Sequence, residues 1–383
     1  MAKVHVLRGQ DRVFGFTLDE QGTNLPRQYG PWTAFKTIEL YHDEPYQGVD
    51  VSVCLDDISK HGFHLTAAHK RITHLAVPVM GERALVLGGG GASGNAWAIG
   101  VVAGLFDGGL DVTQADLIIG TSSGSTVAAQ IASTTRPPEL LAAILAGVPQ
   151  AAVPPLRTGP AGSGAGRVPI GPVANHMEII SGIIGAAQDA PDMRRRLGAA
   201  ALEMDAAPDG SKQTQWRSTV AARLPSHDWP QRTMLITAVD AHTGEPVVFD
   251  RHSGVELVDA VAASCTNGFG VPPYGIGERR YIDGGYRANL NADLAAGYAR
   301  VLVLSPFGGR CLHPLEWGTH LAAQADELRA RGSRVETIFP DSNSQNVLGD
   351  GMTVMDLSRR GPSAQAGYTQ GSALAEQLTE FWR

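Results

Sequence analysis

Two short glycine-rich motifs contain side chains that could act as a nucleophile and a base. Residues 120–124 read Gly-Thr-Ser-Ser-Gly, a G-x-S-x-G motif. In a nucleophile elbow this serine lies on a sharp turn between a strand and a helix, so that its hydroxyl projects from the turn. The apolar residues 117–119 indicate a buried strand and residues 126–132 a helix. The motif predicts that Ser122 is a nucleophile; the alternative is an ordinary serine-capped turn.

The glycines on either side of Ser122 have a steric role in this prediction. The serine needs a strained backbone conformation if its hydroxyl is to project from the turn. Gly120 and Gly124 have no Cβ, so the strand and the helix can approach each other closely. The helix would then direct its N-terminal N–H groups toward the reacting atoms.

The second motif is Asp283-Gly284-Gly285, which follows a predicted short strand at residues 280–282. A carboxylate at the end of a strand, followed by two glycines, is well placed for a catalytic base. The alternative is a structural turn, because Asp-Gly is a common tight-turn pair. Histidines that could instead complete a Ser-His-Asp triad lie in no triad-like motif; they are His242, His252 and His313.

A glycine loop at residues 88–94 precedes the serine motif by one predicted strand. The spacing of Gly89, Gly91 and Gly94 fits G-x-G-x-x-G, which binds a dinucleotide pyrophosphate at a helix N-terminus. Consecutive backbone N–H groups suit an oxyanion hole equally well, because they stabilise the negative oxygen of a tetrahedral intermediate. The serine motif after the next strand favours the oxyanion interpretation.

Alternating strands and helices would position these motifs. Short apolar runs predict buried strands, and residues 95–106, which are apolar nearly all round, predict a buried helix. This alternation predicts an α/β layered fold with a parallel sheet and a site at the carboxyl ends of its strands. The predicted strands are 84–87, 117–119, 301–304 and 333–339, with a hairpin at 234–240 and 247–250; further helices are 139–146, 177–187, 193–204, 255–264, 315–331 and 364–381.

Residues 1–78 predict a small, mainly β N-terminal module of unknown role. Residues 4–7, 13–16, 32–41 and 49–55 are strand-like, and turn residues separate several of these runs. Four histidines in this module lack acidic or cysteine partners at regular spacing, so we predict no metal site; they are His61, His64, His69 and His74.

Residues 148–190 form a second distinct segment. Its first part is rich in Pro, Gly and Ala and contains few charges, and apolar helical sequence follows. A long apolar segment inside a compact domain suits a cap or lid over an apolar pocket, and the alternative is a surface insertion.

Composition excludes several classes of protein. The 383 residues are 43% hydrophobic and 18% charged, which predicts a sizeable core. The net charge is −7 and the sequence has no cluster of Lys and Arg, so we predict no basic surface for binding nucleic acid. The three cysteines are too far apart for a disulfide framework or a metal motif. The N-terminus has no apolar leader, and glycines interrupt the uncharged run at 84–106, so we expect a soluble cytoplasmic protein.

Together the motifs resemble those of the patatin-like phospholipase family. The resemblance covers residues 81–383, and residues 1–78 lie outside it. It implies a patatin-like three-layer α/β/α fold with a mostly parallel central sheet, beside the small β module. The residues that carry the resemblance are 85–91, 120–124, 263–265 with Pro272 and Pro273, and 281–285 with Asn289.

The resemblance also implies the roles of the site residues. The family uses a Ser–Asp dyad without histidine, which makes Ser122 the nucleophile and Asp283 the base. The implied oxyanion hole consists of the N–H groups of Gly89, Gly90 and Gly91. The glycines that support the motifs are Gly94, Gly120, Gly124, Gly284 and Gly285.

Two positions depart from the family pattern. Ser93 stands where the glycine loop usually has Arg or Lys, and Gly268 stands where a proline is usual. Loss of the cation at position 93 affects the expected binding of an anionic head group more than it affects the expected fold.

The resemblance implies a serine acyl hydrolase that cleaves lipid carboxylic esters through an acyl-enzyme, with no metal or organic cofactor. A phospholipid and a neutral ester are both open as substrates, and we expect transient contact with a membrane surface. The alternative is a non-catalytic nucleotide-binding or scaffold protein that uses the glycine loop. The sequence does not indicate an oligomeric state.

Overall fold

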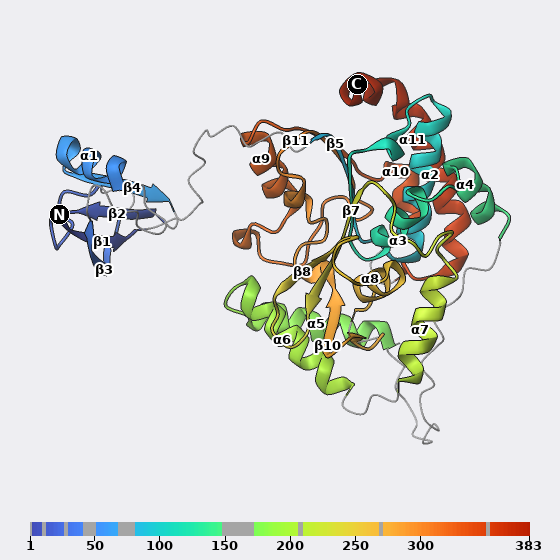
Figure 1. Cartoon of the computed structure of the whole chain (residues 1–383), viewed down its shortest axis with the longest axis horizontal. Coiled ribbons are helices and arrows are strands. Elements are labelled where there is room, and N and C mark those ends of the chain that lie inside the picture. The colour runs from blue at the N-terminus through green and yellow to red at the C-terminus, as the bar shows by residue number, and fades with distance from the viewer. Residues whose placement is uncertain are drawn as a thin grey trace. The chain divides into compact units, whose positions relative to one another are not determined.

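The computed structural model describes residues 2–9, 13–26, 30–40, 51–67, 81–147, 172–205, 210–267, 271–349 and 353–383. The chain divides into two compact units, Met1–Leu75 and Ala76–Arg383 (Figure 1). The module boundary predicted at residue 78 lies outside the described residues.

The N-terminal unit is an antiparallel sheet of four strands in the order β3-β1-β2-β4, with one helix packed on it. Its core includes Val4, Ile38, Cys54 and Ile58, which are all buried. The mainly β character predicted for this unit is confirmed. The elements are β1 (Ala2–Arg8), β2 (Val13–Thr17), β3 (Thr33–Leu40), α1 (Val51–His61) and β4 (Phe63–Ala67).

The strand predicted at 49–55 is wrong, because residues 51–61 form α1. The sequence there alternates apolar and polar residues, but Val51, Cys54 and Ile58 also recur at helical spacing and are buried on one side. Packing of that helical face on the sheet decides the outcome. In the same unit His64 Nδ1 lies 2.6 Å from Asp57 Oδ2, whereas His69 and His74 lie outside the described residues.

The larger unit is built around a mixed sheet in the order β12-β11-β5-β6-β7-β10-β9, with β8 paired to β7. The five strands from β12 to β7 are parallel, and β8, β9 and β10 pair antiparallel. The mostly parallel sheet predicted from the apolar runs is confirmed. The strands are β5 (Gly81–Leu87), β6 (Leu117–Gly120), β7 (Thr233–Asp240), β8 (Pro246–Phe249), β9 (Tyr274–Ile276), β10 (Arg279–Asp283), β11 (Tyr298–Leu304) and β12 (Arg334–Ile338).

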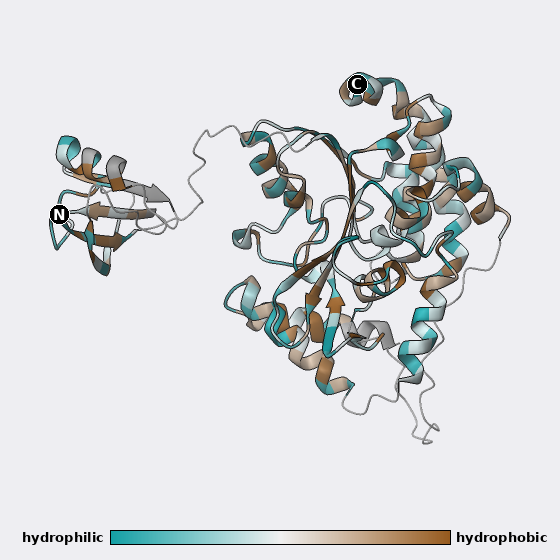
Figure 2. Ribbon diagram, viewed as in Figure 1, coloured by the Kyte–Doolittle hydropathy of each residue, from teal (hydrophilic) through white to brown (hydrophobic). Residues whose placement is uncertain are grey.

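Helices cover both faces of this sheet, which gives the three-layer α/β/α arrangement (Figure 1). The apolar strands appear brown between the two helical layers in Figure 2, because parallel strands are buried on both faces. One face carries α2 (Gly91–Asp107), α3 (Ser123–Ile131), α4 (Pro137–Leu145), α7 (Ser211–Ala221), α8 (Leu257–Ser264), α10 (Ser342–Leu348) and α11 (Arg360–Trp382). The other carries α5 (Pro172–Ala186), α6 (Ala190–Met204) and α9 (Leu321–Ala330).

Two predicted helices have different bounds. The helix expected at 315–331 is a short 3-10 turn, Leu315–Trp317, followed by α9, and Gly318 with a φ of 66° separates them. The helix expected from residue 95 begins at Gly91, so the last glycines of the loop form its first turn. No described helix is long and apolar enough to cross a membrane.

The predicted cap, residues 148–190, is described only from residue 172 onward. There α5 buries Ile180 and Ile184 against Met193 and Leu197 of α6, and these side chains pack in one cluster with Ile282 of β10. The described part of the segment therefore contributes to a helical layer of the fold.

Helices α2 and α11 pack with their backbones in unusually close contact. A Cβ added to Gly104 would lie 2.2 Å from the Tyr368 carbonyl oxygen, and one added to Gly367 would lie 2.2 Å from that of Trp97. Because backbone rather than flexible side chain occupies this space, glycine is required at both positions.

We expect Gly104→Ala to lower the free energy of unfolding by about 1–3 kcal/mol, because the methyl group would force the two helices apart. Gly182→Ala is the matched control: nothing lies within 4 Å of the added Cβ, and it should stabilise α5 by roughly 0.5–1 kcal/mol. Urea unfolding of both variants measures the two effects. Equal effects of the two substitutions would contradict a close backbone contact between α2 and α11.

Candidate active site

Ser122 occupies a strained turn between β6 and α3. Its φ of 54° and ψ of −128° are rare for a residue with a side chain, as the motif predicts. Its backbone N–H donates to Ser264 Oγ at 2.9 Å, and its carbonyl oxygen accepts from Ser125 Oγ at 2.6 Å and Cys265 Sγ at 3.0 Å. Hydrogen bonds on both sides of the residue therefore hold the turn.

The two motif glycines allow this geometry sterically. A Cβ on Gly124 would lie 2.1 Å from the Leu87 carbonyl oxygen, and one on Gly120 would lie 2.5 Å from Ser125 Cα. Both contacts are far below van der Waals distance, so helix α3 can approach β5 and β6 only because these residues are glycines. The steric role predicted for the two glycines is confirmed.

Asp283 reaches Ser122 from a strand that runs in the opposite direction. Strand β7 continues past the last residue of β6, and β10 pairs antiparallel with this extension, so that Asp283 lies opposite Ala238. The Ser122 hydroxyl lies close enough to the Asp283 carboxylate to lower its pKa, and Asp283 Oδ1 accepts a hydrogen bond from the Gly285 N–H at 2.7 Å. The structure thus brings the two predicted residues together.

Burial changes the acid–base behaviour of Asp283. Loss of solvent around the carboxylate raises its pKa to about 6, although the nearby Ser122 hydroxyl and the Gly285 N–H act in the opposite direction. No nearby cation of the described chain contributes to this pKa shift. The carboxyl group therefore takes up a proton more readily than an exposed aspartate does.

No histidine completes a triad among the described residues. Neither Ser122 nor Asp283 has a hydrogen bond to a histidine there. His313 is buried elsewhere, with its Nδ1 2.9 Å from Thr319 Oγ1, and burial lowers its pKa to about 4. The described arrangement is therefore a pair, one hydroxyl and one carboxylate.

The glycines after β5 differ in whether their N–H groups are available. The Gly89 N–H donates to the Asn289 carbonyl oxygen at 3.3 Å, whereas the N–H groups of Gly90 and Gly91 donate to no described residue. The Ser123 N–H at the start of α3 is also unused among the described groups. Ser123 was not predicted from the sequence, although the residue after an elbow serine is a general signal for an oxyanion donor.

Gly89 instead provides space beside the hydroxyl. A Cβ at this position would lie 2.9 Å from Asn289 Oδ1, 3.3 Å from Ser122 Cβ and 3.8 Å from Ser122 Oγ. Any larger residue would therefore fill the space next to the serine. Gly284 has a similar constraint, because its Cβ would lie 2.2 Å from Thr237 Oγ1.

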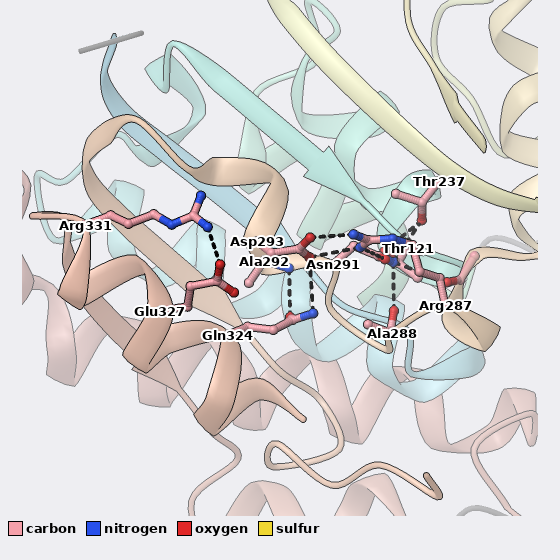
Figure 3. Close-up of polar contacts among 11 residues, drawn as sticks. Thr121, Thr237, Arg287, Ala288, Asn291, Ala292, Asp293, Gln324, Glu327 and Arg331 are labelled. Atoms are coloured by element: carbon pink, nitrogen blue, oxygen red, sulfur yellow. Dashed lines mark hydrogen bonds and ion pairs between the residues drawn. The ribbon is translucent and has the colours of Figure 1, made fainter. Parts of the chain in front are cut away.

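A buried asparagine, Asn291, joins the serine turn to the Asp-Gly-Gly turn (Figure 3). Its Nδ2 lies 2.9 Å from Thr121 Oγ1, 3.2 Å from Thr237 Oγ1 and 2.7 Å from the Ala288 carbonyl oxygen. Asn291 also adopts a φ of 52°, which asparagine tolerates better than most residues. It was not predicted from the sequence.

Charged and polar residues behind Asn291 hold its amide in place. Arg287 Nη1 donates to Asn291 Oδ1 at 2.7 Å and to Asp293 Oδ1 at 2.9 Å (Figure 3). Gln324 Nε2 donates to the same Asp293 oxygen at 3.1 Å, which connects the network to α9. With both its oxygen and its nitrogen in hydrogen bonds, the amide has a fixed orientation.

The geometry combines a hydroxyl, a carboxylate that can accept its proton and unused N–H groups at two helix N-termini. Such an arrangement suits nucleophilic attack on a carbonyl group, because the N–H groups can stabilise the oxyanion that forms. Among the described residues no group of three or more His, Cys, Asp or Glu side chains could hold a metal ion.

Comparison with a protein-family model agrees with this description. The family model "Patatin-like phospholipase" matches residues 85–296, more than half of the chain. No curated protein matches the sequence. Among solved structures the chain is similar to VipD from Legionella pneumophila (11% identity, TM-score 0.37, covering 83% of this chain and 69% of that one) and to the type III effector protein ExoU (16% identity, TM-score 0.33, covering 79% and 54%).

Burial of Asp283 predicts how its replacement changes stability with pH. A carboxyl group whose pKa is raised in the folded state contributes stability below the unfolded pKa of 3.8, and this contribution is lost as the pH rises through about 6. The asparagine in Asp283→Asn does not titrate, so the variant does not lose this stability as the pH rises. We expect the free energy of unfolding of the variant, minus that of the wild type, to grow by about 1–2 kcal/mol between about pH 5 and pH 8.

Asp250→Asn is the control for this measurement. Hydrogen bonds, chiefly from the Ser253 hydroxyl, lower the pKa of Asp250, so its contribution to stability is lost only below the unfolded pKa. Its replacement should change the free energy of unfolding by a nearly constant amount over the same range. Urea unfolding at several pH values measures both variants, and a flat difference for Asp283→Asn would contradict the burial argument.

Proposed function

The chain belongs to the patatin-like phospholipase family, and we propose that it is a serine acyl hydrolase that cleaves lipid carboxylic esters with Ser122 as nucleophile and Asp283 as base. The observation that carries the proposal is that the Ser122 hydroxyl, on a strained turn next to unused N–H groups, lies close enough to the buried Asp283 carboxylate to lower its pKa. The family supports a lipid ester as the substrate.

In the first half of the proposed reaction Ser122 Oγ attacks the ester carbonyl carbon while Asp283 takes the hydroxyl proton. The carbonyl oxygen becomes an oxyanion in the tetrahedral intermediate. The intermediate then expels the alcohol, which receives the proton from Asp283, and an ester between Ser122 and the acyl group remains. In the second half Asp283 accepts a proton from water as the water oxygen attacks the acyl carbonyl carbon. The second tetrahedral intermediate then breaks the bond between Ser122 Oγ and the acyl group, the fatty acid leaves, and Ser122 Oγ receives the proton from Asp283.

We propose that the oxyanion is bound by the N–H groups of Gly90 and Gly91, with Ser123 as a further donor. Support comes from their free N–H groups and from their positions at the N-termini of α2 and α3, where the helix dipoles favour negative charge. Each such donor contributes roughly 3 kcal/mol to transition-state stabilisation. In this proposal Gly89 contributes the space beside the hydroxyl and Gly94 the close packing of α2 against Pro306.

A raised pKa suits Asp283 for the role of a base. A carboxylate with an ordinary pKa near 4 is a weak base at neutral pH, and efficient proton transfer needs a pKa closer to the working pH. Burial moves the pKa of Asp283 in that direction, to about 6.

We further propose that residues 81–383 form the acyl hydrolase domain, with residues 1–78 as a separate module and part of 148–190 as a cap.

A fluorophosphonate probe tests for the activated serine directly. We expect the wild type to be labelled and Ser122→Ala to be unlabelled and to lose hydrolysis of p-nitrophenyl butyrate by at least about 1,000-fold, as expected for loss of a nucleophile. Ser133→Ala is the matched control, because its hydroxyl bonds the Gln130 carbonyl oxygen outside the site. Labelling or hydrolysis that survives in Ser122→Ala would refute the proposal and leave a nucleotide-binding role to be tested.

The pH dependence of hydrolysis tests the base. Asp283 acts only when it is ionised, so kcat/KM for a short soluble ester should rise with pH and level off above a pKa of about 6. The Asp283→Asn variant should lose this rise of kcat/KM with pH, together with most of the activity. Steady-state rates between about pH 4.5 and pH 8.5 measure it; an unchanged profile in Asp283→Asn would exclude this residue as the base.

A further inference from the structure

We propose that the side-chain amide of Asn289 is a further catalytic group, which donates a hydrogen bond to the oxyanion that develops on the ester carbonyl oxygen. The amide joins the N–H groups of Gly90, Gly91 and Ser123 as a donor. The inference rests on the proposed hydrolase function and deepens it, because it assigns a part in the reaction to a side chain outside the dyad and the glycine loop.

Asn289 lies beside the nucleophile and is attached to the glycine loop. Its backbone carbonyl oxygen accepts the Gly89 N–H at 3.3 Å. A Cβ added to Gly89 would lie 2.9 Å from Asn289 Oδ1 and 3.8 Å from Ser122 Oγ. The amide and the hydroxyl therefore border the same small space, which is open because residue 89 is a glycine.

The same amide also lies near the base without binding to it. A Cβ added to Gly285 would lie 3.0 Å from Asp283 Oδ1 and 3.8 Å from Asn289 Oδ1. Asn289 Nδ2 nevertheless makes no hydrogen bond to the carboxylate or to any other described group. A role in holding Asp283 does not account for the amide, so we look for its partner in the substrate.

The buried donor of Asn289 needs an acceptor that the described chain does not supply. Nδ2 is buried and has no hydrogen-bond partner among the described residues. Such a donor is costly, because it has lost its hydrogen bonds to water and gained none in return. Buried polar groups are paired in the great majority of cases, so this one requires a specific reason. The carbonyl oxygen of an ester under attack by Ser122 is an acceptor in the right place.

Asn291, two residues further along, is a structural asparagine and shows the contrast (Figure 3). Its Nδ2 lies 2.9 Å from Thr121 Oγ1 and 3.2 Å from Thr237 Oγ1, and its Oδ1 accepts from Arg287 Nη1 at 2.7 Å. Both ends of that amide are used by the fold. The Nδ2 donor of Asn289 is not, so the hydrogen bonds of the fold do not explain an asparagine at position 289.

The glycine loop lacks one donor that the family resemblance implies. The resemblance assigns the N–H groups of Gly89, Gly90 and Gly91 to the oxyanion hole, but the Gly89 N–H is bound by the Asn289 carbonyl oxygen. The residue that occupies this N–H brings an unused N–H of its own to the same space. Asparagine side chains serve as oxyanion donors in acyl transfer, as backbone N–H groups do.

A second buried polar atom without a described partner lies next to the nucleophile, the hydroxyl oxygen Oγ of Ser123. The Ser123 N–H is also unused among the described groups. Unpaired polar groups thus follow Ser122 in the chain and also face it across Gly89. Their concentration at this place agrees with a ligand oxygen that accepts several hydrogen bonds at once.

Asn289→Leu tests the proposal, because leucine has a similar volume and no hydrogen-bonding atom. We expect kcat for p-nitrophenyl butyrate to fall by about 100- to 1,000-fold with little change in KM, since the lost hydrogen bond forms mainly in the transition state. Asn289→Ala should lose the same factor, which separates loss of the donor from a steric block. Asn343→Leu, on the exposed side of α10, is the control and should leave kcat unchanged. A wild-type kcat in either Asn289 variant would overturn the proposal.

Urea unfolding separates this role from a structural one. Asn289→Leu should leave the urea midpoint unchanged or raise it, because the variant removes a buried donor that has no described partner. Asn291→Leu should lower the midpoint, because it leaves the Thr121, Thr237 and Arg287 side chains without a partner. A midpoint that falls equally in both variants would overturn the proposal and make Asn289 a structural residue.

A trifluoromethyl ketone provides a readout that a structural role would not change. Addition of Ser122 Oγ to the carbonyl carbon of hexyl trifluoromethyl ketone forms a tetrahedral oxyanion, while Asp283 takes the hydroxyl proton. Asn289→Leu should raise the inhibition constant of the ketone by the factor by which it lowers kcat/KM. The corresponding alcohol forms no oxyanion, so its inhibition constant should not change. An equal change for ketone and alcohol would contradict an oxyanion contact.

Failure of the proposed function gives a different result from failure of this inference. Hydrolysis or fluorophosphonate labelling that survives in Ser122→Ala would refute the function itself. Hydrolysis that depends on Ser122 but not on Asn289 would leave the function in place and overturn only the role of the amide.

Discussion

The candidate active site of the larger unit depends on one constraint, a serine held with positive φ at the carboxyl end of a buried parallel strand. This conformation costs of the order of 1–3 kcal/mol, and it persists only because the surroundings determine it. Ser264 accepts from the serine N–H, and Ser125 and Cys265 donate to its carbonyl oxygen. The absence of Cβ atoms at Gly120 and Gly124 lets the helix close over the strands.

The sheet topology adds the second half of the site. A wholly parallel sheet would present only strand ends that point the same way, whereas the extension of β7 beyond β6 gives β10 an antiparallel partner above the serine turn. Asp283 consequently points back toward Ser122 from the opposite direction. Asn291 fixes this arrangement, because one buried amide contacts residues that follow β6, lie within β7 and follow β10.

Charge at the candidate active site is unbalanced before substrate binds. The N-termini of α2 and α3 point their positive ends toward it. Asp283 is buried, and no cation of the described chain lowers its pKa. In the proposed enzyme this imbalance is useful: the carboxylate can accept a proton, and the negative charge that develops on the substrate oxygen is met by N–H groups.

The sequence by itself determined those features of the fold and of the candidate site that depend on local steric fit and on burial of apolar residues. Buried parallel strands are apolar on both faces, and a serine elbow needs glycines on either side, so apolar runs and motif spacing were sufficient for the sheet, for the steric role of the elbow glycines and for the candidate pair Ser122 and Asp283. Tertiary structure alone decided the rest. Residues 51–55 fit a strand or a helix locally, and packing on the N-terminal sheet selected the helix. Asn291 carries no motif, because its position depends on contacts between segments far apart in the sequence, which no local pattern encodes.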